Sequence, residues 1–252
     1  MLTFKTSVKV FSCLAFIITG AAVAGPAINV GELNEYIQGN KNSLAKRIQN
    51  TGDSTAFVRV DVSEIVFNGE KYSEQSLDSD ALIRGKGTGL MSSPARLIVP
   101  AGGAQTNRLL ITGDRSRERY YRVRYVPVMP KEAGEFGVTN KELEAYKKQV
   151  KAGVNVLTGY GTIVTVLPHN PSFDTRISTA GNRLLVSNNG NGSVVVQGLK
   201  SCKGEDEREC SGQTTHQVRP GSRFEQAIPA GHVLHYNLIE GLQKKALTTK
   251  QK

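Results

Sequence analysis

Residues 154–167 read VNVLTGYGTIVTVL, the longest β-prone run in the chain. Valine, threonine, isoleucine and tyrosine favour extended backbone because their side chains pack well on a pleated surface. Alternate side chains of a strand point to opposite faces. One face of this run carries Val154, Val156, Thr158 and Tyr160. The run ends at Pro168, after which the composition changes, so we expect one long strand followed by a domain boundary.

Shorter runs of the same kind precede and follow this stretch. Residues 57–62 and 121–125 alternate with period two, and residues 184–186 lead into the turn signal Asn188-Asn189-Gly190. Short runs separated by Gly, Asn, Pro and Asp are typical of antiparallel sandwiches. The sequence therefore predicts an all-β protein.

The rest of the chain is read in the same way. Beyond the boundary, strands are expected at residues 182–188, 193–200, 216–219, 223–227 and 233–238. Residues 140–151 predict either a helix or a charged hairpin loop. Residues 244–252 are polar and basic with little to bury, so a frayed tail is expected. The length suits two domains, residues 25–168 and 169–252, the second ending in the basic tail.

The first 24 residues have the pattern of a secretory signal. Lys5 and Lys9 precede an apolar run that ends in Ala22-Val23-Ala24. We therefore expect export, with a mature chain that starts near Gly25. No later segment approaches the roughly 20 apolar residues of a membrane-spanning helix, so we do not expect an integral membrane protein.

Export would leave two cysteines, Cys202 and Cys210, because Cys13 lies in the signal. An even pair in an oxidising compartment predicts a disulfide. Residues 203–209 are mostly charged and read as an exposed loop, which makes two free buried cysteines the weaker alternative. The spacing is not the Cys-x-x-Cys of a redox centre.

Charge and motifs exclude several classes of function. The formal net charge of +10 falls to +8 without Lys5 and Lys9, which favours acidic partners or membrane surfaces. A signal, a cysteine pair and no arginine-rich helix argue against nucleic acid. The sequence lacks the motifs of serine hydrolases, zinc proteases and phosphate-binding loops. His232 and His235 would lie on opposite faces of a strand. We therefore expect no enzyme, no metal and no cofactor.

The order of these segments resembles the periplasmic chaperones of fimbrial (pilus) subunits in the chaperone–usher pathway, particularly the alternate branch that serves CS1/CFA-like and common-pilus fimbriae. The stretches that carry the resemblance are residues 28–33, 46–50, 57–62, 93–102, 118–123 and 159–164, then Cys202, Cys210 and Pro220-Gly221. No single stretch is diagnostic, and their order gives the match its weight.

The resemblance implies two immunoglobulin-like domains set as an L and a location in the periplasm. Its partners would be fimbrial subunits, which lack their last strand and expose an apolar groove, and an outer-membrane usher that takes the subunits over. The chaperone would act through donor-strand complementation, lending an extended strand to the subunit. Residues 154–167 are the expected donor, with Val154, Val156, Thr158 and Tyr160 entering the subunit. The alternative is an ordinary core strand, and both roles can hold together.

The better-known branch of this family grips the carboxylate at the end of the subunit with an arginine and a lysine. Counting along the chain puts Leu33 and Ile163 at those positions, so neither is basic here. If a carboxylate is anchored, the nearest basic residues are Lys46, Arg47, Arg122 and Arg124. Arg122 and Arg124 share a strand face, and a solvated face is the equally weighted alternative.

Two other functions compete with this reading. A fimbrial subunit or adhesin is also secreted and β-rich, but it should carry one incomplete sandwich. Another secreted β-sandwich protein that binds carbohydrate should show surface aromatics, and this chain has no tryptophan. A homodimer in which two copies cap each other's donor strand is a further expectation.

Overall fold

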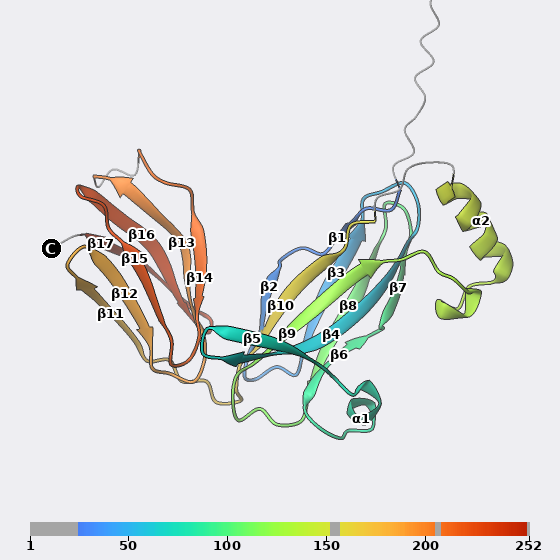
Figure 1. Ribbon diagram of the computed structural model, residues 1–252, viewed down its shortest axis with the longest axis horizontal. Coiled ribbons are helices and arrows are strands. Elements are labelled where there is room, and N and C mark those ends of the chain that lie inside the picture. Colours follow the sequence, from blue (N-terminus) through green and yellow to red (C-terminus); the bar gives the residue numbers. More distant parts are fainter. Residues whose placement is uncertain (1–24, 152–156, 205–207, 251–252) are drawn as a thin grey trace, which may run out of the picture.

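The computed structural model describes residues 25–151, 157–204 and 208–250 of the chain. Strands gather in two sandwiches set at an angle to each other and joined at one end (Figure 1). The all-β fold with two immunoglobulin-like domains in an L is confirmed. The expected signal, residues 1–24, lies outside the described residues.

The first sandwich holds the first ten strands of the described chain. They are β1 (Ile28–Asn29), β2 (Asn34–Ile37), β3 (Ser43–Asn50), β4 (Ala56–Asn68), β5 (Lys71–Ser76), β6 (Gly89–Ser93), β7 (Arg96–Val99), β8 (Ala104–Thr112), β9 (Arg119–Pro127) and β10 (Tyr160–Val166). One sheet has the order β1-β3-β8-β6, and the other has the order β2-β10-β9-β4-β5, with β7 paired to β4. The long strand β4 continues past β9 as a hairpin with β5.

The second sandwich holds the remaining seven strands of the described chain. They are β11 (Thr175–Ala180), β12 (Arg183–Asn188), β13 (Val194–Lys203), β14 (Thr214–Val218), β15 (Arg223–Ala227), β16 (His232–Glu240) and β17 (Gln243–Lys250). Its sheets have the orders β11-β12-β15 and β14-β13-β16-β17. The division of the chain at residue 168 stays a prediction, and it falls between β10 and β11.

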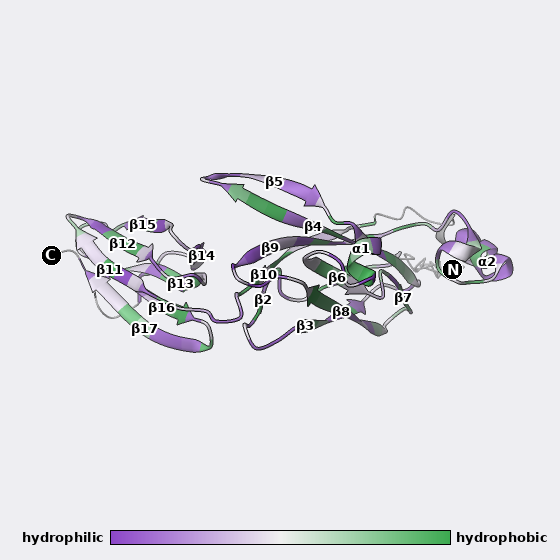
Figure 2. Cartoon of the chain, turned by 90° about the horizontal axis from the view of Figure 1, so that it is seen from below, coloured by the Kyte–Doolittle hydropathy of each residue, from purple (hydrophilic) through white to green (hydrophobic). Residues whose placement is uncertain are grey.

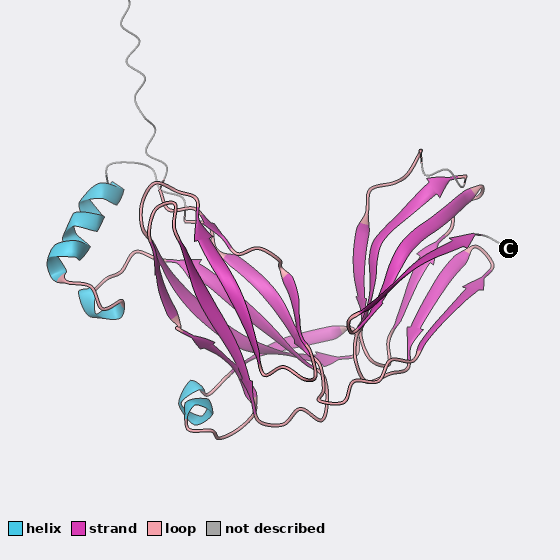
Figure 3. Ribbon diagram, turned by 180° about the vertical axis from the view of Figure 1, so that it is seen from behind, coloured by secondary structure: helices cyan, strands magenta, loops and turns pink. Residues whose placement is uncertain are grey.

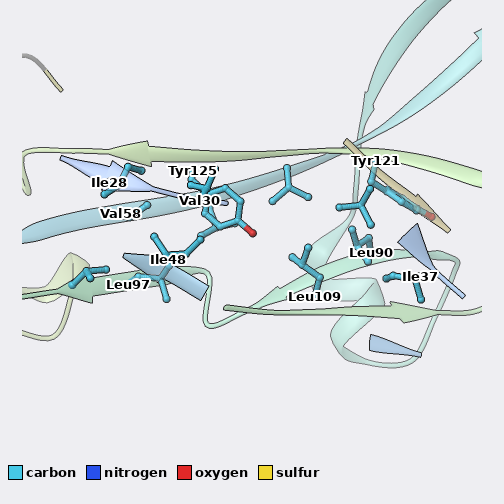
Figure 4. Packing of buried hydrophobic residues seen from close by; sticks show 14 of the residues in the cluster. Ile28, Val30, Ile37, Ile48, Val58, Leu90, Leu97, Leu109, Tyr121 and Tyr125 are labelled. Atoms are coloured by element: carbon cyan, nitrogen blue, oxygen red, sulfur yellow. The ribbon is translucent and has the colours of Figure 1, made fainter. Parts of the chain in front are cut away.

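Each sandwich encloses its own apolar core because the inward side chains of its two sheets alternate with outward polar ones. In the first sandwich, Tyr121, Val123 and Tyr125 of β9 are fully buried against the opposite sheet (Figure 4). Leu184, Val196 and Leu234 belong to the corresponding cluster of the second sandwich.

Short helical segments accompany the strands, namely α1 (Ser79–Ile83), the 3₁₀ turn η1 (Ala133–Glu135) and α2 (Asn140–Lys151) (Figure 3). Of the two readings for residues 140–151, the helix is confirmed. It begins with a capping box, in which Glu142 accepts from the backbone of Thr139 and the Thr139 hydroxyl accepts from the backbone of Glu142. Tyr146 anchors the helix against Phe57 of β4.

The end of the chain differs from expectation. Residues 244–250 do not fray, because they form most of β17, which pairs with β16 from Glu240↔Gln243 to Val233↔Lys250. Leu247 packs on the core, but most of β17 is exposed, so the strand has little hydrophobic pattern to read. The basic tail is therefore an edge strand of the second sandwich.

The expected disulfide is confirmed. Cys202 of β13 is bonded to Cys210 across an isolated antiparallel bridge. The disulfide closes the charged loop at the end of the second sandwich.

Candidate functional site

Strand β10 has one fully paired side and one partly open side. It pairs with β9 over its whole length, from Tyr160↔Tyr125 to Val166↔Arg119. On its other side, β2 runs parallel to it and first meets it at Ile163, whose N–H donates to the carbonyl of Leu33 at 2.7 Å. The peptide groups of Gly161, two residues earlier, point to the same side as those of Ile163. In the described pairing, the start of β10 thus offers an edge for another strand.

The four residues expected to enter a subunit lie at this end of the chain segment. Val154 and Val156 fall outside the described residues. Thr158 is exposed, and Tyr160 is half-buried against the first core. Tyr160 shares its face with Val164, which is fully buried in the same core. The assignment as donor residues stays a prediction.

Arg122 and Arg124 of β9 lie on the opposite face of the same sheet, and one carboxylate brings them together. Arg122 Nε donates to Glu74 Oε1 at 2.9 Å, and Arg124 donates through a terminal nitrogen to Glu74 Oε2 at 2.7 Å. Glu74 comes from β5, two strands away from β9 in the sheet. The expectation that the two arginines share one patch is confirmed, whereas their role stays a prediction.

A surface pocket of about 450 Å³ adjoins this ion pair. Its lining residues are Tyr72, Glu74, Arg122, Arg124, Val126, Gly159, Tyr160 and Gly161. Partial burial opposes ionisation of Glu74, but hydrogen bonds from Arg124, Ser63 and Arg122 outweigh it and hold the pKa of this carboxyl below its usual value. The site therefore contains two cations and one anion, directly beside the open end of β10.

The other two basic residues are placed differently. Lys46 is buried between the sheets, where its amino group donates to Glu35 and to the carbonyl of Glu32, both at 2.6 Å. Arg47 is exposed on β3, in the sheet that does not contain β10. The structure therefore does not bring Lys46 and Arg47 together with Arg122 and Arg124. Lys46 ties β3 to β2, which holds the parallel partner of β10 in place.

The face that carries Arg122 also meets the second sandwich. Thr165 of β10 accepts a hydrogen bond from Gln217 of β14 at 3.0 Å. The guanidinium of Arg219 lies 3.6 Å from the ring centre of Phe67 and donates to the carbonyl of Gly69, both at the tip of the β4–β5 hairpin. Figure 2 shows this hairpin projecting from the first sandwich toward the second. The arginine pair thus lies on the face that looks into the angle between the sandwiches.

A buried carboxylate links the two sandwiches at the base of this face. Glu118, just before β9, accepts hydrogen bonds from the backbone N–H of Ser193 at 2.6 Å and from the Ser193 hydroxyl. It also accepts from the hydroxyl of Tyr120. Burial raises the pKa of the Glu118 carboxyl, and these hydrogen bonds oppose that effect. The contact fixes the start of β13 against the first sandwich.

The segment between the sandwiches is held by a buried arginine. Arg115 donates to the carbonyls of Leu167, Gln38 and Lys41 at 2.6, 3.0 and 2.5 Å. Gly39 lies so close to this segment that an added Cβ would be 2.6 Å from the carbonyl oxygen of His169. These contacts fix the direction in which the chain leaves β10.

Comparison with known proteins was made for both sequence and fold. The chain is 26% identical over 200 residues to a protein of Escherichia coli named as a CS1 fimbrial subunit, covering 78% of each protein. It is 22% identical over 210 residues to the protein named "Probable fimbrial chaperone EcpB" of E. coli O1:K1, covering 82% of this chain and 84% of the relative. No family model matches the chain.

The fold gives the same answer. The crystal structure of the class 5 fimbriae chaperone CfaA superposes with a TM-score of 0.55 and 19% identity, covering 90% of this chain and 99% of CfaA. By sequence and fold, the chain is a relative of fimbrial chaperones. A chaperone in complex with a tip adhesion protein, CsuC–CsuE of Acinetobacter baumannii, matches with a TM-score of 0.50 and 15% identity over 90% of the chain.

As a relative of fimbrial chaperones, the chain belongs to a group of binding proteins and not of enzymes. Within the described residues, no group of three or more His, Cys, Asp or Glu is arranged to hold a metal. No helix in that part of the chain is long and apolar enough to cross a membrane.

Three residues of this fimbrial-chaperone relative were missed by sequence reasoning: Glu74, Glu118 and Arg219. Glu74 lies in a hairpin without hydrophobic alternation, since all residues of β5 are exposed. Glu118 meets Ser193 across 75 residues of sequence. The one signal in the sequence was Glu118 itself, an acidic residue at the head of a strand whose inward face is otherwise apolar.

Proposed function

We propose that this protein is a periplasmic chaperone that captures fimbrial subunits through donor-strand complementation and delivers them to an outer-membrane usher. The observation that carries the proposal is the open edge of β10, where β2 stops at Ile163 and the strand continues toward residue 160 with one partner in the described pairing. An edge of this kind can pair with another chain through backbone hydrogen bonds. The relatives named above support the same function.

Side-chain direction supports the choice of donor residues. Even-numbered residues of β10, such as Val164 and Val166, point into the core of their own sandwich. A strand that continues regularly toward Val156 and Val154 keeps that direction. Beyond the end of the sandwich the same face would enter the apolar groove of a subunit. The core of the chaperone and the core of its guest would then be continuous.

The arginine pair supplies the second half of the binding site in this proposal. Arg122 and Arg124 lie on the face that looks into the angle between the sandwiches, beside Gly161 of β10. A guanidinium binds a carboxylate with two parallel hydrogen bonds. The terminal carboxylate of a subunit would bind here and set the register in which its strand pairs with β10.

A variant pair tests the donor assignment directly. Val156→Asp puts a charge on the face that enters the subunit, whereas Asn155→Asp puts the same charge on the opposite face. Burying an unpaired carboxylate is strongly unfavourable, so Val156→Asp should abolish recovery of subunit with the tagged chaperone. Asn155→Asp should leave the recovery close to that of the wild-type chain.

Both variants must fold for this comparison to count, which circular dichroism and the melting temperature would establish. Normal recovery of subunit with folded Val156→Asp would contradict the donor assignment. Equal loss with both variants would contradict the assignment of faces. Recovery of polymers of the chain itself would instead identify it as a fimbrial subunit.

A further inference from the structure

Glu74 holds the arginine pair as a guest carboxylate would. Its two oxygens accept separately from Arg122 and Arg124, and Oε2 also accepts from the hydroxyl of Ser63 at 2.8 Å. The side chain is one-quarter exposed, as is that of Arg122, so the group faces solvent at the pocket. A carboxylate bridging two guanidinium groups is the arrangement by which proteins recognise acidic ligands.

Access to the arginines from β10 is open because Gly161 has no side chain. A Cβ added at Gly161 would meet Arg122 at 3.6 Å from Cδ and 3.7 Å from a terminal nitrogen. Any longer side chain would therefore extend over the guanidinium. A strand paired to the edge of β10 could instead place its own end beside Arg122.

The strand that carries Glu74 is able to give way. All six residues of β5 are exposed, and β5 is the edge strand of its sheet, paired to β4 alone in the described sheet. Ion pairs on such a surface contribute little to folding, because water solvates the separated charges well. Two arginines and one glutamate leave a net charge of +1 at the site, which still attracts an anion.

We propose that Glu74 is an internal carboxylate that occupies Arg122 and Arg124 in the free protein and is replaced by the carboxylate of the guest. This inference rests on the proposed role of the arginine pair in capturing the guest. Glu74 is tethered, so it competes at high effective concentration against any small carboxylate in solution. A guest carboxylate delivered by a strand already paired with β10 is tethered too. The contact therefore favours strand-borne carboxylates over free ones.

Sodium acetate is a suitable probe, because it carries the carboxylate without the strand. Binding would be followed by the Nε–Hε signals of ¹⁵N-arginine-labelled protein, at constant ionic strength set with chloride. Glu74→Gln removes the internal anion and keeps the shape. We expect it to bind acetate at Arg122 and Arg124 at least about tenfold more tightly than the wild-type chain, the factor for one charge-assisted hydrogen bond.

The chain offers a matched control in its second sandwich. Glu225 lies between Arg183 and Arg223, at 3.3 and 3.2 Å. Glu225→Gln should leave acetate binding at Arg122 and Arg124 unchanged. Equal acetate affinity in Glu74→Gln and wild-type protein would overturn the proposal. So would tighter binding that persists when Arg122→Ala and Arg124→Ala are added to Glu74→Gln.

Subunit capture separates this inference from the proposed function. The acetate titration involves no subunit, so it decides whether Glu74 occupies the pair. Capture by Glu74→Gln, compared with Glu225→Gln, decides whether that occupancy restrains the guest. We expect Glu74→Gln to retain subunit at higher salt than Glu225→Gln does. Acetate binding with no gain in capture would overturn the replacement of Glu74 by the guest.

Discussion

Arg122 on β9 is the direct cross-strand neighbour of Ile163 on β10. Ile163 in turn is joined to Leu33 through a backbone hydrogen bond. Leu33 and Ile163 occupy the positions where the resemblance implied an arginine and a lysine. The charge missing from these two positions is therefore present one strand away, on the same face of the sheet. A site can keep its chemistry when the residue that supplies it moves to an adjacent strand.

The arginine pair should matter for binding and not for folding. Replacing Arg122 and Arg124 together with Ala should weaken subunit capture at least about tenfold, because each charge-assisted hydrogen bond contributes about 1.5–3 kcal/mol. The melting temperature should change little, since exposed ion pairs contribute about 0–1 kcal/mol. Arg59→Ala is the control, since Arg59 pairs with Asp61 in solvent. Unchanged affinity for subunit would return the pair to a solvated strand face.

Glu118 should make stability depend on pH. Its pKa is raised above 4.5, mainly by burial. Its stabilising contribution is thus complete below the unfolded pKa and is lost as the pH rises through the folded pKa. Lowering the pH from about 7 toward about 5 should therefore raise the free energy of unfolding of the wild-type chain relative to Glu118→Gln. Urea unfolding at several pH values measures this difference, and parallel pH profiles would refute the assignment.

The disulfide should stabilise the second sandwich alone. Cys202 and Cys210 are separated by 8 positions, and a loop of that length corresponds to about 2–3 kcal/mol of unfolding free energy. The double substitution to Ser should lower the thermal stability of the second sandwich by that amount. Subunit capture at low temperature should persist, because β10 belongs to the first sandwich. Loss of capture in a folded double variant would show that the loop itself takes part in binding.

Helix α2 should depend on one aromatic cluster. The ring centre of Phe57 lies 4.7 Å from that of Tyr146 and 5.1 Å from that of Phe136. Truncating a buried aromatic to Ala costs about 3–5 kcal/mol, and an isolated helix of this length is marginal in water. Tyr146→Ala should therefore speed amide exchange in residues 140–151 and leave β11–β17 unchanged. Glu144→Ala, on the exposed side of the helix, should have neither effect.

Sequence patterns predicted those parts of the fold that have an inward and an outward face. The alternation in residues 57–62 and 121–125 identified β4 and β9, and residues 223–227 match β15. Strands β5 and β17 were missed because neither buries a regular apolar face. Their position depends on backbone pairing with a neighbour, which a hydrophobic pattern does not record.

The candidate site shows the same limit. Strand alternation was enough to place Arg122 and Arg124 on one face. It could not show that Glu74 reaches them, since that depends on where the β4–β5 hairpin turns at Gly69. Nor could it show that Lys46 is consumed by Glu35, which requires the packing of one sheet on the other. Contacts between elements distant in sequence, and not the elements themselves, were beyond reach.

The most direct test of the central claim is native mass spectrometry of the tagged chain purified from the periplasm of its own bacterium. A chaperone that lends β10 to its guest should appear as a one-to-one complex with fimbrial subunits, and Val156→Asp should appear without them. A ladder of masses built from the chain alone, or the chain without any subunit, would contradict this account.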